Sequence, residues 1–402
     1  MKYNILLVAP FISLKGETYF NRFRYLAQKL TERGYNLTLL TSNFEHFTKN
    51  FRSDNVDSYF EGYEIVLLQE SGYDSNVSIK RFKSHSVFCQ SLQQFLLSNT
   101  KKFDLIYSAY PLICSNIILG KYAKEHTIPF VLDIQDIWPE SIAPVLGKAF
   151  TLFKPIIHLI SSRANKAYGY ADGLIAVSQT YLDRGLLKSS PTHSSVAYIG
   201  ADVEKIQNIP SIRKNKNEFW VIYVGTLSHS YDLTSVIKAS SLLQKDHKEI
   251  KIFIIGKGKD RTKLEALNNQ LHAQVTFLDA MPYDDMVSYL KQADIGLNAI
   301  SKYALQSITN KISDYICTQT PVLNSSVNTE IMDLIDLNKV GLNYNALNPE
   351  DLKDKIVYLY QNPNILQNFK ENLLTLQKRF NRKYEYTKIY QIIAKLLKDF
   401  NV

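Results

Sequence analysis

The sequence predicts an α/β protein made of two Rossmann-like domains. Short apolar runs alternate with longer amphipathic segments along most of the 402 residues. Continuous apolar runs between helices are typical of parallel strands that helices cover on both faces. The alternation is interrupted by the charged segment IPSIRKNKNE, residues 209–218, and then restarts. Because the chain is longer than one typical core allows, we expect two domains, residues 1–208 and 215–379.

The first domain is expected to enter a strand at once. A helix over Phe20–Arg33 is predicted to end at Gly34, since glycine commonly terminates helices. The runs predicted as buried strands are Tyr3–Val8, Leu37–Leu40, Ile65–Leu68, Leu105–Ser108, Phe130–Ile134 and Gly173–Val177.

The second domain repeats this pattern and is followed by a helical tail. Its predicted strands are Trp220–Val224, Ile250–Ile255, Val275–Leu278, Ile295–Ala299 and Val322–Asn324. Its predicted helices lie near Leu233–Gln244, Lys259–His272, Tyr283–Gln292 and Ile308–Cys317. Asn364–Arg379 and Tyr384–Phe400 are amphipathic, and apolar residues at helical spacing in the second segment predict a packed helix rather than a frayed extension.

Composition narrows the class of protein. No run reaches the roughly 18 apolar residues of a membrane-spanning helix. The amino-terminal MKYNILLVAP has no cleavage site, which argues against a signal peptide. Cys89, Cys114 and Cys317 are widely spaced and predict neither a disulfide framework nor a zinc site, and no histidine spacing suggests a metal. We therefore expect a cytoplasmic protein.

The net charge of +9 favours anionic partners. No nucleic-acid-binding signature is present, so we expect no nucleic acid partner. Two segments, Ser78–Phe95 and Lys148–Lys166, place basic residues such as Lys80, Arg81 and Lys83 beside bulky apolar ones. Such segments suit helices that lie on an anionic membrane surface. Core-facing helices with solvated basic edges remain the alternative.

The segment QSITNKISDYICTQTPV, residues 306–322, carries the most specific chemistry. Lys311 and Asp314 lie three residues apart on one face of the predicted helix. The backbone N–H groups at the start of that helix suit a phosphate. Lys311 is expected to neutralise a diphosphate, and Asp314 to accept hydrogen bonds from ribose hydroxyls. The alternative is an ordinary ion pair on a helix surface.

This segment resembles the donor-binding motif of the retaining family-four glycosyltransferases, which have the GT-B fold. In that motif two carboxylates stand eight positions apart; here Gln306 and Asp314 take their places, and Gln319 replaces the usual glycine. SITNKISDY is similar to the version found in the branch that builds bacterial surface polysaccharides.

Further matches lie elsewhere in the chain. FVLDIQDIWPES, residues 130–141, resembles a segment of the same family, with Gln135 in place of His or Arg and with Asp136 and Glu140 retained. YVGTLSHSYDL, residues 223–233, resembles its donor turn, where Thr226 and Tyr231 replace the basic residues that hold the pyrophosphate in many members. IIGKGKDRTKLE, residues 254–265, resembles the family's Gly-x-Gly turn.

The resemblance implies two Rossmann-like domains that face each other across a cleft, with a last helix, residues 380–402, that returns to the first domain. It implies transfer of a sugar with retention from a nucleoside diphosphate sugar, foremost a UDP-sugar such as an N-acetylated hexosamine. The implied acceptor is lipid-linked or a glycan, in capsule or O-antigen type synthesis at the inner face of the cell membrane. No cofactor or metal is implied.

The resemblance also assigns roles to residues. Asp136 would orient the acceptor or the reacting sugar, Lys311 would neutralise the leaving group, and Gln306 would touch the donor sugar. Other implied donor contacts are Gly225, Thr226, Gly256, Met281, Ser307, Ile308 and Asp314. Glu140 would contact the acceptor.

Gly16 and Glu17 lie in the loop after the first predicted strand. A side chain at Gly16 would block a close approach of the acceptor to the backbone, and Glu17 is expected to contact the acceptor. The alternative is that Gly16 only forms the turn.

Two other functions remain open. One is a GT-B epimerase acting on UDP-N-acetylhexosamines. The other is a non-catalytic nucleotide-sugar-binding subunit, which the substitutions Gln135, Gln306 and Gln319 favour.

Overall fold

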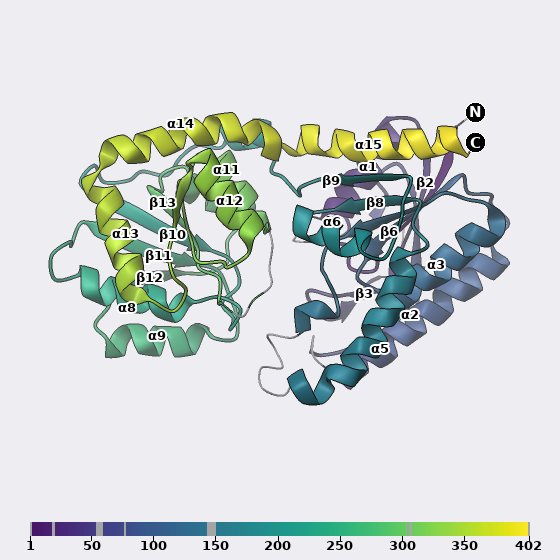
Figure 1. The fold of residues 1–402 in the computed structure, drawn as a ribbon, viewed down its shortest axis with the longest axis horizontal. Coiled ribbons are helices and arrows are strands. Elements are labelled where there is room, and N and C mark those ends of the chain that lie inside the picture. Colours follow the sequence, from purple (N-terminus) through teal and green to yellow (C-terminus); the bar gives the residue numbers. More distant parts are fainter. Residues whose placement is uncertain are drawn as a thin grey trace. The chain divides into compact units, whose positions relative to one another are not determined.

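The structure is a computed structural model and describes residues 2–17, 21–53, 59–75, 78–142, 150–302, 304 and 308–400 (Figure 1). The chain forms two compact units: Met1–Ala197 with Tyr386–Val402, and Tyr198–Glu385. The prediction placed the ends of the first domain's two segments differently, with residues 1–208 and 380–402 in that domain. Helix α7 (Val203–Asn208) consequently lies in the second unit, whereas the prediction assigned it to the first.

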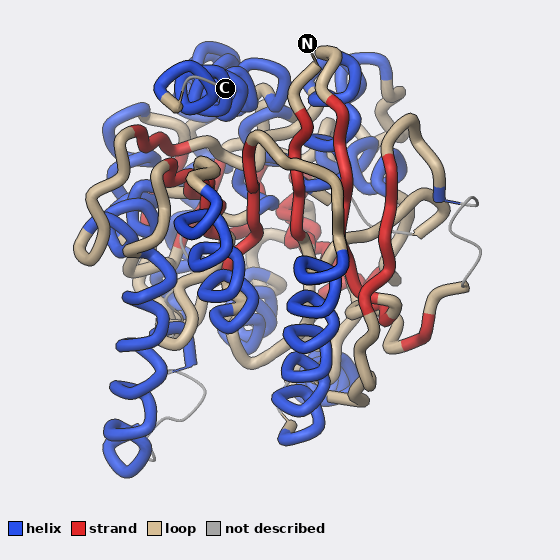
Figure 2. Tube along the Cα trace, turned by 90° about the vertical axis from the view of Figure 1, so that its right-hand side faces the viewer, coloured by secondary structure: helices blue, strands red, loops and turns tan. Residues whose placement is uncertain are grey.

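The first unit contains a seven-stranded, wholly parallel sheet. Figure 2 shows its strands side by side between helices. The strand order is β5-β2-β1-β6-β7-β8-β9, with the bounds β1 Asn4–Val8, β2 Asn36–Ser42, β5 Glu64–Leu68, β6 Leu105–Tyr110, β7 Phe130–Ile134, β8 Gly173–Ala176 and β9 His193–Val196. Strands β6, β7 and β8 are buried along their whole length, which explains their continuous apolar character.

Five described α-helices accompany this sheet before the second unit begins: α1 Arg22–Glu32, α2 Ile79–Ser98, α3 Ile113–His126, α5 Phe150–Tyr168 and α6 Gln179–Leu186. A short hairpin of β3 (Phe44–Glu45) and β4 (Asn50–Phe51) follows β2. A disulfide joins Cys89 on α2 to Cys114 on α3, so the prediction that the cysteines form no disulfide framework was wrong. These cysteines are distant in sequence, and only the packing of α2 on α3 brings them together.

A buried ion pair ties α1 to the sheet. The Nε of Arg22 donates to Asp133 Oδ2 at 2.8 Å, and its Nη1 donates to the carbonyl of Ala197 at 2.8 Å. Asp133 also accepts from Tyr107 Oη at 2.5 Å and from Gln135 Nε2 at 2.6 Å. Burial opposes the charge of Arg22, but Asp133 raises the pKa of the guanidinium above its ordinary value. These hydrogen bonds offset the desolvation of both charges.

The carboxy-terminal helix α15 (Arg382–Asp399) belongs largely to the first unit. Its residues Tyr386, Ile389, Ile393 and Leu396 are fully buried in the same core cluster as β1 and α1. This unit is therefore built from two separate stretches of sequence.

The second unit contains a six-stranded parallel sheet of order β12-β11-β10-β13-β14-β15. The strands are β10 Phe219–Val224, β11 Ile250–Ile255, β12 Val275–Leu278, β13 Ile295–Asn298, β14 Val322–Asn324 and β15 Gly341–Asn343. Its remaining helices are α8 Leu233–Leu243, α9 Arg261–Gln270, α10 Tyr283–Leu290, α11 Asn310–Cys317, α12 Thr329–Asn338, α13 Pro349–Gln361 and α14 Pro363–Phe380. The predicted pair of Rossmann-like domains is confirmed.

The strand order of this sheet runs outward from β10 in both directions. Chain order therefore reverses between β10 and β13, and the loops that follow these two strands diverge. Open α/β sheets bind ligands at such a switch point, beyond the carboxyl ends of the strands. Among the described residues, no helix is long and apolar enough to cross a bilayer.

Candidate functional site

Two glycines shape the carboxyl edge of the second sheet. Gly225 follows β10 with φ +140°, and Gly256 follows β11 with φ +147°. A Cβ on Gly256 would lie 1.9 Å from the carbonyl oxygen of Gly225, a separation that no side chain tolerates. Glycine is therefore required here for the two loops to run past each other, which keeps this edge of the sheet open to a ligand.

Lys311 lies at the same edge, in the first turn of α11. Its Nζ is 4.3 Å from the ring centroid of Tyr223 and 3.8 Å from that of Tyr231. The amine donates to Tyr223 Oη at 3.3 Å, and a Cβ on Gly225 would lie 3.2 Å from it. The side chain is only 7% exposed. Helix α11 thus delivers an amine to the end of β10, directly at the switch point.

Burial lowers the pKa of Lys311 well below its ordinary value. Within the described part of the chain, its one hydrogen bond goes to the neutral Tyr223 hydroxyl, and the two rings offer only weak cation–π attraction. An anion beside the amine would restore the charge that burial disfavours. The hydroxyl of Thr309, the residue that caps α11, is also buried with no hydrogen bond to another described residue.

Asp314 lies one helical turn further along α11 and faces different groups. Its Oδ1 accepts a hydrogen bond from Tyr283 Oη at 2.8 Å. Burial raises the pKa of Asp314 to about 6, while the Tyr283 hydrogen bond and the charge of Arg382 act in the opposite direction. Lys311 and Asp314 form no ion pair with each other, so the alternative of a simple surface pair is wrong.

The other predicted donor residues lie along this edge or near it. Thr226 is exposed, and its carbonyl accepts from Tyr223 Oη at 2.8 Å. Ile308 is buried just before α11, and Met281 lies in the loop between β12 and α10. Gln306 and Ser307 lie outside the described residues.

Sequence reasoning missed the aromatic partners of both site residues. Tyr223 was treated only as part of a strand, and Tyr231 only as the residue that replaces a family lysine. Nothing in the sequence indicated that Tyr283 donates a hydrogen bond to Asp314 or that the charge of Arg382 lowers the pKa of its carboxyl. The absence of the family's basic residues at 226 and 231 was a usable clue, because the amine of Lys311 lies against the ring of Tyr231.

Two predicted residues of the first unit, Asp136 and Glu140, lie after β7. Asp136 is half-buried, and Ser141 Oγ donates to it at 3.4 Å. Burial raises the pKa of Asp136, although Ser141 and the charge of Arg81 lower it. Glu140 accepts from Nε and Nη2 of Arg184 at 2.8 and 2.6 Å. Arg184 therefore fixes Glu140, whereas Asp136 retains a carboxylate held by a single weak side-chain hydrogen bond.

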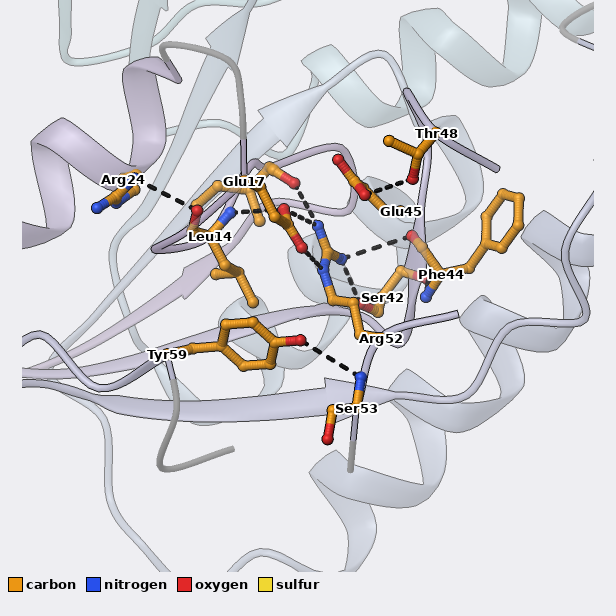
Figure 3. Close-up of polar contacts among 11 residues, drawn as sticks. Leu14, Glu17, Arg24, Ser42, Phe44, Glu45, Thr48, Arg52, Ser53 and Tyr59 are labelled. Carbon is orange, nitrogen blue, oxygen red and sulfur yellow. Dashed lines mark hydrogen bonds and ion pairs between the residues drawn. The ribbon is translucent and has the colours of Figure 1, made fainter. Parts of the chain in front are cut away.

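Gly16 and Glu17 belong to the loop after β1. Hydrogen bonds of the Glu17 carboxylate hold this loop in place (Figure 3). Glu17 accepts from Nε and Nη2 of Arg52 at 2.7 and 2.9 Å and from the backbone N–H of Leu14 at 2.7 Å. Gly16 has φ +87°, and no atom lies within 4 Å of a Cβ built on it. The backbone conformation, rather than a lack of space, favours glycine there.

Residues 204–374 match the family model described as glycosyl transferases group 1. An uncharacterized glycosyltransferase of Methanocaldococcus jannaschii is 28% identical over 207 residues, which cover 49% of this chain and 52% of that protein. The match thus spans about half the length of this relative. The UDP-N-acetylglucosamine–N-acetylmuramyl-(pentapeptide) pyrophosphoryl-undecaprenol N-acetylglucosamine transferase of Rickettsia felis is 25% identical over 256 residues, which cover 59% of this chain and 69% of that protein.

Among solved structures, HepE of Anabaena in complex with UDP is similar with a TM-score of 0.70 and 14% identity, covering 98% of this chain and 100% of that one. At this identity the likeness concerns the fold alone, which is of the GT-B type. The family-model match and the fold together support a relationship to group 1 glycosyltransferases. Within the described residues, no three His, Cys, Asp or Glu side chains are grouped so as to hold a metal ion.

Because its amine is buried, we expect Lys311 to lower the free energy of unfolding of the protein. Lys311→Met keeps the length of the side chain and removes the amine, so we expect the free energy of unfolding to rise by about 1–3 kcal/mol at pH 7. Because the unfolded lysine binds a proton that burial disfavours, this gain should shrink as the pH rises toward the ordinary lysine pKa. Calorimetric unfolding between pH 7 and pH 10 measures both effects.

The matched control is Lys238→Met, which changes an exposed lysine on α8. Its stability should stay within about 0.5 kcal/mol of the parent. A Lys311→Met protein that is less stable than the parent would show that the amine is well compensated in the folded state.

Proposed function

We propose that this protein is a glycosyltransferase that moves a sugar from a nucleoside diphosphate sugar, foremost a UDP-sugar, onto a lipid-linked acceptor with retention. The proposal extends to bacterial surface polysaccharide synthesis. The observation that carries it is the Lys311 amine, buried against two tyrosine rings at the switch point of the second sheet. An anion beside this amine would favour its charged form, and a diphosphate supplies one where parallel sheets bind nucleotides.

Three features of this edge support the proposed position of the donor diphosphate. Lys311 supplies positive charge when protonated, the start of α11 supplies backbone N–H groups that the N-cap side chain does not bond, and Gly225 leaves room beside the amine. The buried hydroxyl of Thr309 offers a further donor. Asp314, one turn later, suits the ribose hydroxyls, because a carboxylate accepts from two neighbouring hydroxyls at once.

In the proposed reaction, the bond between the sugar C1 and the leaving diphosphate breaks and a glycosidic bond to the acceptor oxygen forms. The acceptor's proton passes to the departing phosphate oxygen on the same face of the sugar. Lys311 stabilises the negative charge that develops on the diphosphate. Asp136 orients the acceptor or the reacting sugar, so most of the catalysis is positioning.

The ionisation of Asp314 gives this site a pH dependence. Asp314 accepts ribose hydrogen bonds more strongly as the ionised carboxylate than as the protonated acid, and burial raises its pKa to about 6. We therefore expect the affinity for UDP to fall as the pH drops through 6, by about tenfold between pH 7.5 and pH 5. Calorimetric titration with UDP across this range measures the effect.

Asp314→Asn separates this effect from the titration of UDP itself. The variant should bind UDP about 1–3 kcal/mol more weakly at pH 7.5, and it should show only the pH dependence of the nucleotide. If parent and variant change in parallel with pH, Asp314 does not contact the ribose.

The function itself is tested in two steps. A thermal-shift screen with UDP, GDP, ADP and dTDP should give its largest shift with UDP. In the second step, two variants should each reduce the transfer of sugar from UDP-sugars to an extracted lipid acceptor, for different reasons. Lys311→Met should lose about 2–4 kcal/mol of transition-state stabilisation. Asp136→Asn should keep the parent's UDP affinity and lose turnover, since its proposed partner is not the nucleotide.

The outcomes also discriminate the alternatives. Isomerisation of UDP-N-acetylglucosamine without any acceptor would identify an epimerase. Tight UDP binding with no turnover on any acceptor would identify a non-catalytic subunit. If no nucleoside diphosphate binds, the proposed donor site is wrong.

The proposed place of action is the inner face of the cell membrane. The amino-terminal part of α5 projects beyond the sheet of its unit (Figure 1) and exposes large apolar side chains. Leu152 is 78% and Leu159 is 65% exposed, and Lys154 and Arg163 are exposed on the same helix. Apolar side chains flanked by basic ones suit an anionic lipid surface.

Replacing Leu152 and Leu159 by Ser should weaken cosedimentation with phosphatidylglycerol vesicles by about tenfold or more, because two exposed leucines lose their burial in lipid. Leu337→Ser is the matched control, since this residue is 80% exposed on α12 in the second unit. Equal binding of all three proteins would contradict a membrane role for α5.

A further inference from the structure

A group of basic side chains lies at the carboxyl edge of the first sheet. It comprises His46 and Lys49, between β3 and β4, and Arg81 and His85 on α2. Two aromatic rings lie among them, those of Phe11 and Tyr73. We call these six residues the β3–α2 cluster. All of them except the buried Tyr73 are half-buried, so their polar groups remain within reach of a ligand.

The rings hold the basic groups close together. The guanidinium carbon of Arg81 lies 5.7 Å from the centroid of Phe11 and 5.7 Å from that of Tyr73. The Nζ of Lys49 lies 4.6 Å from the centroid of Tyr73. The imidazoles of His46 and His85 lie 5.1 and 5.5 Å from the ring of Phe11, on which both pack. Arg81 Nε approaches His85 Nε2 at 3.4 Å.

Positive charge exceeds negative charge in the cluster. Burial, reinforced by the neighbouring cations, lowers the pKa of His46 to about 3 and of His85 to about 4, so both are neutral imidazoles at pH 7. Burial and Arg81 together lower the pKa of Lys49 to about 8. The Glu70 carboxylate, whose charge acts in the opposite direction on Lys49, accepts from the hydroxyls of Ser42 and Ser84 at 2.5 and 2.9 Å. Cations that depress one another's charge are stabilised by an added anion.

The cluster neighbours the residue proposed to act on the acceptor. Arg81 is near enough to Asp136 for its charge to lower the pKa of that carboxyl, against the larger effect of burial. A charged group bound by the cluster would therefore be within electrostatic reach of Asp136 in the same unit. The aromatic rings add a surface suited to a sugar face or an isoprenoid carbon chain.

We propose that the β3–α2 cluster binds the phosphate or diphosphate that joins the acceptor saccharide to its lipid. Arg81 and Lys49 contact the anion, and neutral His46 and His85 donate ring N–H groups to it. This inference rests on the proposed function and names the chemical class of its acceptor. Arg81, predicted with Lys80 and Lys83 as part of a membrane patch, instead turns toward Phe11 and Tyr73.

Calorimetric titration of the full chain with geranyl diphosphate tests the proposal, with geraniol as the uncharged comparison. Arg81→Gln and Lys49→Gln should each weaken binding of geranyl diphosphate about tenfold or more, and geraniol should bind no better to the parent than to the variants. Lys80→Gln is the matched control, because this neighbour on α2 is 72% exposed and pairs with Asp74 outside the cluster. Its affinity should equal that of the parent.

Titration of each variant with UDP reports on the fold and on the donor site separately. Retained UDP binding with unchanged affinity for geranyl diphosphate in Arg81→Gln overturns the cluster proposal and leaves the proposed function standing. If the parent protein does not bind UDP, the proposed glycosyltransferase function is overturned. Equal weakening in Lys80→Gln would mean general electrostatic attraction and also overturns the cluster. If the variants bind phosphatidylglycerol vesicles more weakly but bind geranyl diphosphate as the parent does, the ligand is a membrane headgroup. This result also overturns the cluster proposal. Arg81→Lys, which keeps the charge, should restore part of the affinity if the glutamine variant folds poorly.

Discussion

Both sheets are wholly parallel, and this constraint determines where polar chemistry is possible in the molecule. Parallel strands are covered on both faces, so most of their side chains are apolar and function is concentrated in the loops at the ends. In the second unit, the strand order reverses at β10 and β13, and the loops after these strands diverge. Gly225, Lys311 and the start of α11 all lie at that point because the topology sends them there. The same rule puts Asp136 and the β3–α2 cluster beyond the strands of the first sheet.

Two buried cations show how the protein separates stability from function. Arg22 is buried, with Asp133 accepting from its Nε and the Ala197 carbonyl accepting from its Nη1, and it joins elements distant in sequence. Lys311 is equally buried, yet the described residues offer it only a tyrosine hydroxyl and two rings. Removing water from a charge is costly, and only the first residue is compensated within the fold. A site that waits for an anionic ligand keeps its cation undercompensated, so that ligand binding supplies the missing interaction.

Most of the fold was predictable because its strands are continuous apolar runs. The predicted strands Ile250–Ile255 and Val275–Leu278 coincide with β11 and β12. Strand β9 was missed because its sequence HSSV is polar and half-buried at the edge of the sheet, and the β3–β4 hairpin because each strand has two residues. Lys311 and Asp314 were identifiable from their spacing and their resemblance to a motif. Their partners were not, because Tyr223, Tyr231 and Tyr283 reach α11 only through tertiary packing. Glu17 illustrates the same limit, since its bonds to Arg52 depend on a turn that no periodicity encodes.

The two cationic sites differ in a way that fits the two substrates proposed for them. The proposed donor site presents one amine beside two tyrosine rings, with a helix start and a carboxylate on the same helix, so it suits a compact group of fixed geometry such as a nucleoside diphosphate. The β3–α2 cluster spreads two cations and two imidazoles around Phe11 and Tyr73 and is more open. An arrangement of that kind tolerates variation in the attached group while retaining the anion. A transferase that adds a sugar to a lipid-linked saccharide needs this combination, since its donor is constant and its acceptor is large, flexible and anchored at one end.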